Sequence, residues 1–389
     1  MNRQEIENIL KNELLDKGIA NQADIEQIMA KMDEALSKLE AQWLDLYSFD
    51  HCKTEAEYKA KIKALSQYFA LYLTDKVKSH TVASIYEKCF GYVKSSESPF
   101  LIIVAGAIAS GKSTVVDCVI PKIYGTNYGI VNKDEIKASN IFKKYIHKTF
   151  GDEHGNLIED FMLSLRDAIG KMAVENKKSI LLEQSCKSDA FLETCAIAKA
   201  NGFKVYGEIV ITPIAFTSLR NVYRYVTGLE ADEQKNTKTA RYEAFVNISD
   251  TYASAPAVLS ELCAHYADSF TVYTSDILKV DTTGKTMAQI FNQVAAGPVS
   301  DISFEIAKKM YDYIDKRIDY VNNIPDIMQS LATTEAKLNQ LDSNPNMIYR
   351  ALPQDDWQPE EARKKLDELN APLDFSYTEH LYGKYSHGQ

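Results

Sequence analysis

The stretch Phe100-Leu-Ile-Ile-Val-Ala-Gly106-Ala-Ile-Ala-Ser-Gly-Lys-Ser-Thr114 decides the fold of this 389-residue chain. Its first six residues are an unbroken apolar run, as in a strand that is buried on both faces of a sheet. Residues 106–114 fit the pattern Gly-x-x-x-x-Gly-Lys-Ser/Thr, and residues 115–120 continue with a helical pattern. A strand, a glycine-rich loop and a helix in this order predict a phosphate-binding loop.

The chemistry of this loop indicates a nucleoside triphosphate as its ligand. Glycines let the backbone N–H groups turn inward toward phosphate oxygens, and the start of the helix adds positive potential. Lys112 can reach the β- and γ-phosphates, and the Ser113 hydroxyl can hold Mg²⁺. The candidate binding residues are therefore Gly106, Ala107, Ile108, Ala109, Ser110, Gly111, Lys112, Ser113 and Thr114.

Apolar spacing divides the chain into three segments. Residues 1–94 repeat apolar residues at steps of three and four, with Gly18 as a helix end and Thr54 to Glu57 as a capping box, and predict a helical bundle. Residues 95–298 alternate helical patterns with short apolar runs, which predicts an α/β fold with a parallel sheet and helices on both faces. Residues 299–389 predict C-terminal helices and a tail. The five predicted strands are Phe100–Ala105, Gly129–Val131, Ser179–Leu182, Val205–Ile211 and Phe270–Tyr273.

Composition narrows the class of protein. The formal net charge of -10 argues against a broad nucleic-acid-binding surface. The six cysteines form no Cys-x-x-Cys pair, so reduced thiols are expected in place of a disulfide framework or zinc site. No apolar run resembles a signal peptide or a membrane span, and we expect a cytoplasmic protein.

Two acids follow predicted strands at the edge where parallel α/β sheets bind their ligands. Asp134 follows the second run and is placed to accept a proton from an acceptor hydroxyl, although it could equally cap the helix that begins there. Glu183 ends the strand at Leu182, where it could bind Mg²⁺ through water or hold the acceptor. The string Asn132-Lys133-Asp134 lacks the spacer of a guanine-reading motif, so a switch GTPase is not indicated.

Two arginines bound a polar stretch after the fourth strand. Arg224 is expected on a helix, and Arg241 follows the stretch Leu229–Lys238. A charged, mobile segment between arginines is typical of a lid that closes over phosphates. The residues thus favour a kinase that transfers the terminal phosphoryl group to a small molecule.

The segment from about Phe100 to Ser275 resembles the zeta toxin family of P-loop kinases. Asn132 to Lys137 is similar to the family motif Asp-x-Asp-x-Phe-Lys/Arg, with Asp134 as the second acid. Leu182 to Ser185 is similar to the family strand Ile-Glu-Gly-Thr, and a basic residue, Lys187, follows it. Asp167 matches an acid one helix earlier. The Arg-Tyr helix of the family resembles Arg224-Tyr225, and its lid arginine resembles Arg241.

This resemblance implies an ATP- and Mg²⁺-dependent kinase for a nucleotide sugar such as UDP-N-acetylglucosamine. It implies that Asp134 is the base, that Asp167, Glu183 and Lys187 bind the acceptor, and that Arg224 and Arg241 stabilise the γ-phosphate. Asn132 and Gln184 depart from the family pattern on the acceptor side. Some relatives phosphorylate nicotinamide nucleotides, so the acceptor stays open.

Family members are held inactive by a separate helical antitoxin. We hypothesise that residues 1–92 inhibit in cis, with a scaffold or dimerisation module as the alternative. Two other classes also stay open: a regulatory nucleotide-binding module without kinase activity, and a polynucleotide kinase. The acidic charge and the lack of an aromatic and basic stripe disfavour the polynucleotide kinase.

Overall fold

The computed structural model describes residues 3–49, 51–131, 133–150, 157–235, 240 and 242–350, and only the backbone of Glu55, Asp134, Glu135 and Lys235. Asn132, Arg241 and the predicted tail within residues 351–389 lie outside the described residues. The chain forms two compact units. The first unit contains Met1–Pro99 and Asn127–Leu181, and the second unit contains Phe100–Thr126 and Leu182–Gln389.

A five-stranded parallel sheet carries the phosphate-binding loop. Its strand order is β2-β3-β1-β4-β5, and the unit boundary falls within β3. All five predicted strands are present, so the α/β prediction is confirmed. The strands are β1 (Phe100–Gly106), β2 (Gly129–Ile130), β3 (Ile180–Gln184), β4 (Lys204–Val210) and β5 (Ser269–Tyr273).

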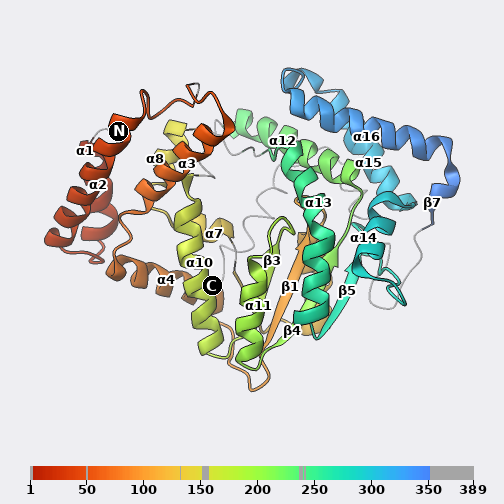
Figure 1. The fold of residues 1–389 in the computed structure, drawn as a ribbon, viewed down its shortest axis with the longest axis horizontal. Helices are drawn as coiled ribbons and strands as arrows, with labels where there is room; N and C mark the ends of the chain where they lie inside the picture. Colours follow the sequence, from red (N-terminus) through yellow and green to blue (C-terminus); the bar gives the residue numbers. More distant parts are fainter. Residues whose placement is uncertain are drawn as a thin grey trace. The chain divides into compact units, whose positions relative to one another are not determined.

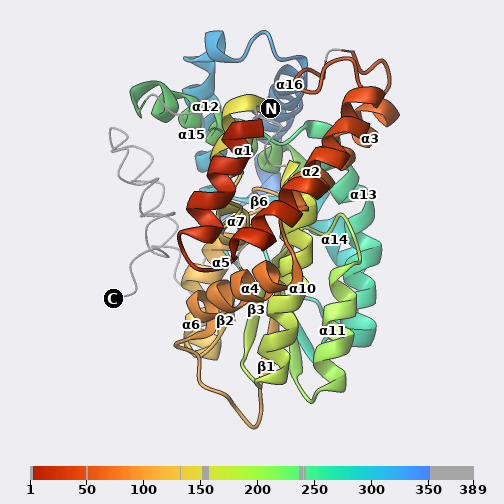
Figure 2. The ribbon, with the colours of Figure 1, turned by 90° about the vertical axis from the view of Figure 1, so that its left-hand side faces the viewer.

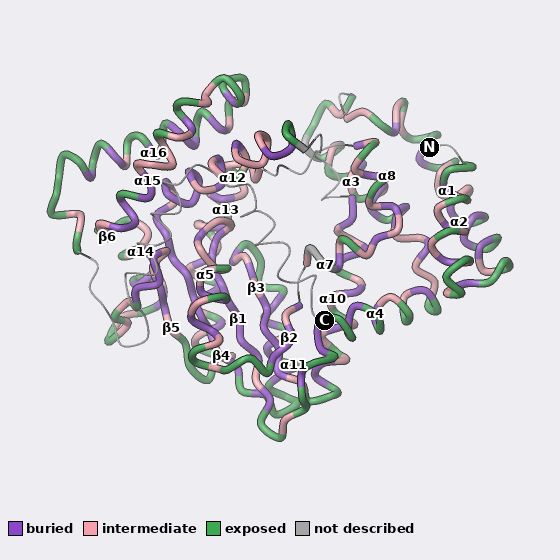
Figure 3. Tube along the Cα trace, turned by 180° about the vertical axis from the view of Figure 1, so that it is seen from behind, coloured by how far each residue is buried: buried purple, intermediate pink, exposed green. Residues whose placement is uncertain are grey.

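Strand β1 lies at the centre of the sheet because its side chains can be buried on both faces. Residues 101–105 are completely buried, as the apolar run predicts. In the second unit, α11 (Phe191–Ala200) packs on one face of β1 and β4 (Figure 1), and α5 (Lys112–Cys118) packs on the other (Figure 3). The loop between β1 and α5 is thereby fixed at both ends.

Further helices of the second unit build a core beside the sheet. Helix α12 (Ile214–Lys235) packs against α15 (Asp301–Asp315) and α16 (Pro325–Ser343). Phe216, Phe304 and Leu331 are among the apolar residues buried in this core. The remaining elements of this unit are α6 (Ile120–Tyr124), α12 (Ile214–Lys235), α13 (Phe245–Glu261), η3 (Leu262–Tyr266), α14 (Met287–Ala296), β6 (Val299–Ser300), α15 (Asp301–Asp315), η4 (Ile318–Tyr320), α16 (Pro325–Ser343), η5 (Pro345–Met347) and β7 (Ile348–Tyr349).

The predicted mobile stretch Leu229–Lys238 differs from the structure over its first seven residues. Residues 229–235 continue α12 as helix, and residues 236–239 lie outside the described part. Contacts made from a distant segment explain the difference, because Glu230 accepts hydrogen bonds from Tyr313 and Arg317. The spacing of residues within this stretch does not reveal hydrogen-bond partners that are distant in the sequence.

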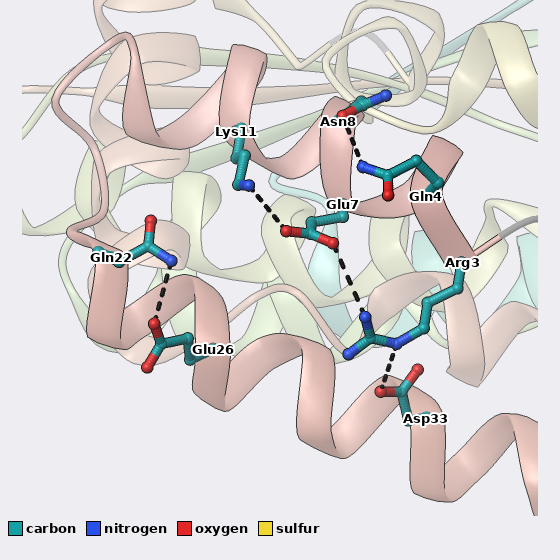
Figure 4. Close-up of polar contacts among 8 residues, drawn as sticks. All are labelled: Arg3, Gln4, Glu7, Asn8, Lys11, Gln22, Glu26 and Asp33. Carbon is teal, nitrogen blue, oxygen red and sulfur yellow. Dashed lines mark hydrogen bonds and ion pairs between the residues drawn. The ribbon is translucent and has the colours of Figure 1, made fainter.

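The first unit is helical and confirms two local signals. Gly18 ends the first helical segment at a φ of 70°, and Thr54 and Glu57 form the predicted capping box. Arg3 forms an ion pair with Glu7 on its own helix and a second ion pair with Asp33 on the helix of residues 22–42 (Figure 4). The unit contains α1 (Arg3–Leu10), η1 (Lys11–Leu15), α2 (Gln22–Gln42), α3 (Glu55–Ala70), α4 (Asp75–Phe90), α7 (Lys133–Ala138), α8 (Lys143–Phe150) and α10 (Glu159–Glu175).

Aromatic side chains hold this unit together. Helix α10 packs against α3 and α4 (Figure 2). Tyr72, just after α3, stacks on Phe161 of α10 at 6.0 Å between ring centroids and meets Phe142 edge-on at 5.4 Å. Helices α3 and α4 therefore share a core with α10 and Phe142. In the described part of the chain, no helix is both long and apolar enough to cross a membrane.

A buried carboxyl group lies in the sheet of the second unit. Glu208 of β4 is 1% exposed and accepts a hydrogen bond of 2.5 Å from the Tyr124 hydroxyl. Burial raises the pKa of Glu208, and this effect outweighs the opposing effects of the hydroxyls of Tyr124 and Tyr273 and of Lys279. The fold therefore favours the protonated form of this side chain.

Replacing Glu208 with glutamine is expected to stabilise the protein above neutral pH. A group whose pKa is raised by folding stabilises the protein fully at pH values below its unfolded-state pKa. This stabilisation is lost as the pH rises through the folded-state pKa. Glutamine resembles the protonated acid at every pH. The variant should gain about 1–3 kcal/mol at pH 8, the usual cost of a poorly solvated polar group.

Thermal unfolding at pH 5 and pH 8 measures this effect, and Glu261→Gln is the matched control because its exposed carboxylate pairs weakly with His265. The gain of the Glu208 variant should shrink at pH 5. An equal gain at both pH values would show that Glu208 is not the titrating group.

Candidate functional site

The loop between β1 and α5 has the backbone of a phosphate cradle. Ala109 and Gly111 have positive φ values of 61° and 104°, which turn the chain twice within three residues. Gly111 precedes the first residue of α5, so the positive end of the helix dipole lies at the loop. The start of a helix attracts phosphate. The residues present fit a nucleoside triphosphate.

Neighbouring segments explain why glycine occupies both fixed positions of the motif. A Cβ atom on Gly106 would lie 2.5 Å from the Val210 carbonyl oxygen and 2.7 Å from the Ser110 hydroxyl oxygen. One on Gly111 would lie 3.3 Å from the Ser275 carbonyl oxygen, at a φ that disfavours side chains. Gly106 pairs with Val210 in the sheet, so the close approach at Gly106 is fixed by strand register.

Lys112 folds back over the loop. Its Nζ donates to the carbonyl oxygens of Gly106 at 2.9 Å and Ala107 at 2.7 Å. The ammonium group is thus held where phosphate oxygens would approach. Ser113, the next residue, is exposed. Among the described residues no three His, Cys, Asp or Glu side chains cluster as metal ligands.

Two successive hydrogen bonds link the loop to Thr212 and Tyr252. The Thr212 hydroxyl donates to the Ser110 carbonyl oxygen at 2.8 Å, and Tyr252 donates to the Thr212 carbonyl oxygen. Cys186 is buried nearby, and burial raises the pKa of its thiol to about 12 despite Lys112 and the Gly106 amide. This thiol stays protonated and is no nucleophile.

Arg220 is a candidate phosphate-binding residue that the sequence analysis missed. Its Nη1 lies 3.5 Å from the Ser110 carbonyl oxygen and 3.7 Å from the position of a Cβ on Gly111. Burial lowers the pKa of Arg220, while buried Asp276 and Tyr252 oppose this effect. Arginine nevertheless keeps its charge. Arg220 lies one helical turn before Arg224, and this spacing was the available signal.

Asp276 is itself firmly held on the loop that follows β5. It accepts hydrogen bonds from Thr274 at 2.5 Å and from Ser300, which caps α15. The neighbouring Ile277 has a φ of 58°, which is rare for a branched side chain. The Asp276 side chain, which acts electrostatically on Arg220, is therefore held in place by hydrogen bonds within the same unit.

The other predicted residues of the second unit lie on three different elements. Arg224 is exposed on α12, and its Nη2 donates to Asn221 Oδ1 at 3.2 Å. Glu183 lies half-buried in β3. Lys187 is exposed and donates to Asn247 Oδ1 at 2.5 Å, with Asp250 at 4.0 Å. Of the predicted site residues, those of the loop are the ones that the second unit brings together.

Two predicted acids belong to the first unit. Helix α7 begins at Lys133, so Asp134 lies within its first turn and not at the capping position that was the alternative interpretation. The side chain of Asp134 is outside the described part. Asp167 is exposed on α10, and Arg166 donates to its Oδ1 from Nε at 3.0 Å and from Nη2 at 2.9 Å.

Comparison with known proteins identifies the domain that carries this loop. The family model described as Zeta toxin matches residues 83–274. Residues 83–274 are a zeta toxin domain. Members of the zeta toxin family are kinases, so the domain is of the phosphotransferase type. No match was found among curated protein sequences.

A solved structure of a related toxin system supports the fold of the zeta toxin domain. A structure from the PezAT chromosomal toxin-antitoxin system of Streptococcus pneumoniae is 17% identical in sequence, with a TM-score of 0.53, over 64% of this chain and 96% of that chain. A structure of AvrRxo1-ORF1:-ORF2 with ATP is 16% identical, with a TM-score of 0.42, over 72% of this chain and 89% of that chain.

All predicted site residues fall within the zeta toxin domain, which begins earlier than the expected core at Phe100. Helices α1 to α3 precede the domain, and α14 to α16 follow it. These flanking helices nevertheless contribute to the cores of the two units, because α3 packs on α10 and α16 packs on α12.

Proposed function

We propose that this protein transfers the γ-phosphoryl group of ATP to a hydroxyl group of a small molecule, with a nucleotide sugar such as UDP-N-acetylglucosamine as the first candidate acceptor. The observation that carries the proposal is the cradle formed by Gly106, Gly111 and Lys112 within a zeta toxin domain. A loop that can accept no Cβ at Gly106 and holds an ammonium group at its centre is suited to phosphate.

The proposed reaction is an in-line displacement. The acceptor hydroxyl oxygen bonds to the γ-phosphorus while the bond from that phosphorus to the β–γ bridging oxygen breaks, and ADP leaves with the electron pair. Asp134 takes the hydroxyl proton. Lys112 holds the β- and γ-phosphates, and Arg224 and Arg241 neutralise the transferring group. Mg²⁺, when bound at Ser113, would supply further charge to the phosphates.

Two of the proposed acceptor-binding residues contact other side chains of the protein. Asp167, Glu183 and Lys187 are proposed to bind the acceptor, yet Asp167 pairs with Arg166 and Lys187 pairs with Asn247. These contacts favour, as a second candidate, a nucleotide-binding regulatory module without transfer activity. They also leave room for another acceptor, such as a nicotinamide nucleotide or a polynucleotide.

Incubation with ATP, Mg²⁺ and a panel of nucleotide sugars, dinucleotides and oligonucleotides tests the proposal. Mass spectrometry should show a gain of one phosphate on a member of the panel. If a nucleotide sugar gains the phosphate, the result supports the first candidate acceptor. If another member of the panel gains it, that compound replaces the nucleotide sugar as the acceptor. If ATP binds and nothing is modified, the regulatory module becomes the better account.

A partner could regulate the enzyme through its helical flank. The proposed partners are a separate antitoxin and, in cis, the N-terminal helices. Packing of α3 and α4 against α10 supports the alternative that these helices are a scaffold. A chain that starts at Ser95 separates the two hypotheses, because loss of inhibition raises its kinase rate whereas loss of a scaffold lowers its melting temperature and rate.

A further inference from the structure

Helix α16 holds the segment that leads into α13. Asp326, in the first turn of α16, accepts a hydrogen bond from the Tyr242 hydroxyl at 2.6 Å and from the Phe245 backbone N–H at 2.7 Å. Helix α13 has no capping side chain of its own at Ala244. The carboxylate of Asp326 therefore satisfies the start of a helix that is distant in sequence.

The same segment is tied to α12 by a buried amide. Asn221 is completely buried, and its Nδ2 donates to the Glu243 carbonyl oxygen at 2.7 Å. Its Oδ1 accepts from the Glu243 N–H at 3.3 Å and from Arg224 Nη2 at 3.2 Å. One side chain thus joins the backbone at Glu243 to the guanidinium group of Arg224.

These contacts form a continuous path from the C-terminal helices to a candidate catalytic arginine. Asp326 fixes residues 242 and 245, residue 243 lies between them and pairs with Asn221, and Asn221 orients Arg224. Asp326 lies outside the zeta toxin domain, which ends at residue 274. Burial and then the Asp326 carboxylate raise the pKa of Tyr242, so its hydroxyl stays a donor.

We propose that Asp326 and Asn221 are positioning residues of the kinase, through which α16 orients Arg224 toward the nucleotide phosphates. The proposal rests on the proposed function, since Arg224 matters only if phosphate is bound. The C-terminal helices would then contribute to the candidate site, although they lie outside the phosphate-binding loop.

The test compares three substitutions in the full chain. Asp326→Ala removes the acceptor, Asp326→Asn keeps one carbonyl oxygen, and Asp342→Ala removes a carboxylate of the same helix that pairs with Lys308 at 3.3 Å on the surface. Asp326→Ala should weaken ATP binding, measured by calorimetry, about 3- to 30-fold, the range seen for contacts that act through a network. Asp326→Asn should recover part of the loss, and Asp342→Ala should bind as the wild type.

A double-mutant cycle distinguishes positioning from general destabilisation. In an Arg224→Ala background, Asp326→Ala should cause little further loss of ATP affinity, because its effect passes through the missing guanidinium group. Equal losses in both backgrounds would overturn the proposal, as would a wild-type affinity in Asp326→Ala.

Hydrogen exchange supplies a readout that needs no nucleotide. The amides of Glu243 and Phe245 should exchange faster in Asp326→Ala than in Asp342→Ala, and unchanged exchange would also overturn the proposal. If Asp326→Ala does not fold, Tyr242→Phe removes one bond to the same carboxylate and takes its place. A wild-type protein that fails to bind ATP refutes the proposed function, whereas failure of the inference appears only in the variants.

Discussion

Lys112→Ala is expected to weaken ATP binding strongly and to reduce phosphoryl transfer by about 100- to 1,000-fold, as the loss of a fixed donor to a developing charge does. The Lys112 ammonium group already lies across the loop on two carbonyl oxygens. It can therefore bind phosphate without a large rearrangement, and alanine offers no replacement. Calorimetry with ATP and a transfer assay measure the two effects.

Lys171→Ala is the matched control, because Lys171 is exposed on α10 and pairs only loosely with Glu175 at 3.9 Å. Arg220→Ala provides a comparison inside the site. The Arg220 guanidinium group contacts the loop at the Ser110 carbonyl oxygen, whereas Lys112 is itself part of the loop. The loss of Arg220 should therefore weaken ATP binding less than the loss of Lys112. Unchanged ATP binding by Lys112→Ala would remove the loop from the mechanism.

The central part of the fold could be predicted because its signals are local. The run Phe100–Ala105 shows a strand that is buried on both faces, and the glycines at 106 and 111 show where the backbone must turn. The capping box at Thr54 is also contained within four residues. Neighbouring residues fix such features, so one sequence is enough to find them.

The contacts that hold the site residues in place could not be predicted, because they come from segments that are distant in sequence. Asp276 acts on Arg220 from the loop that follows β5, and Asp326 reaches Phe245 because α16 packs against α12, so both contacts depend on tertiary structure. The same reason explains why residues 229–235 are helical. The polar composition of Leu229–Lys238 suggested a loop, but Glu230 is held by partners on and after α15.

Asp134→Asn is expected to leave ATP binding near that of the wild type while reducing transfer by about 100- to 10,000-fold, the usual contribution of a general base. Asparagine has nearly the same shape but cannot accept the hydroxyl proton. The position of Asp134 in the first turn of α7 leaves a competing role, in which its charge merely stabilises the start of that helix.

Asp75→Asn isolates that competing role. Asp75 is also a first-turn aspartate, in α4, and it is exposed. If Asp134 acts only on its helix, both variants should lower the free energy of unfolding by about 0.3–1 kcal/mol and leave transfer unchanged. If Asp134 is the base, only its variant loses transfer, and it does so at unchanged ATP affinity. Lys112→Ala should lose ATP binding and phosphoryl transfer together, whereas Asp134→Asn should lose transfer alone. Comparison of these two variants therefore separates the residue that holds phosphate from the residue that removes the proton.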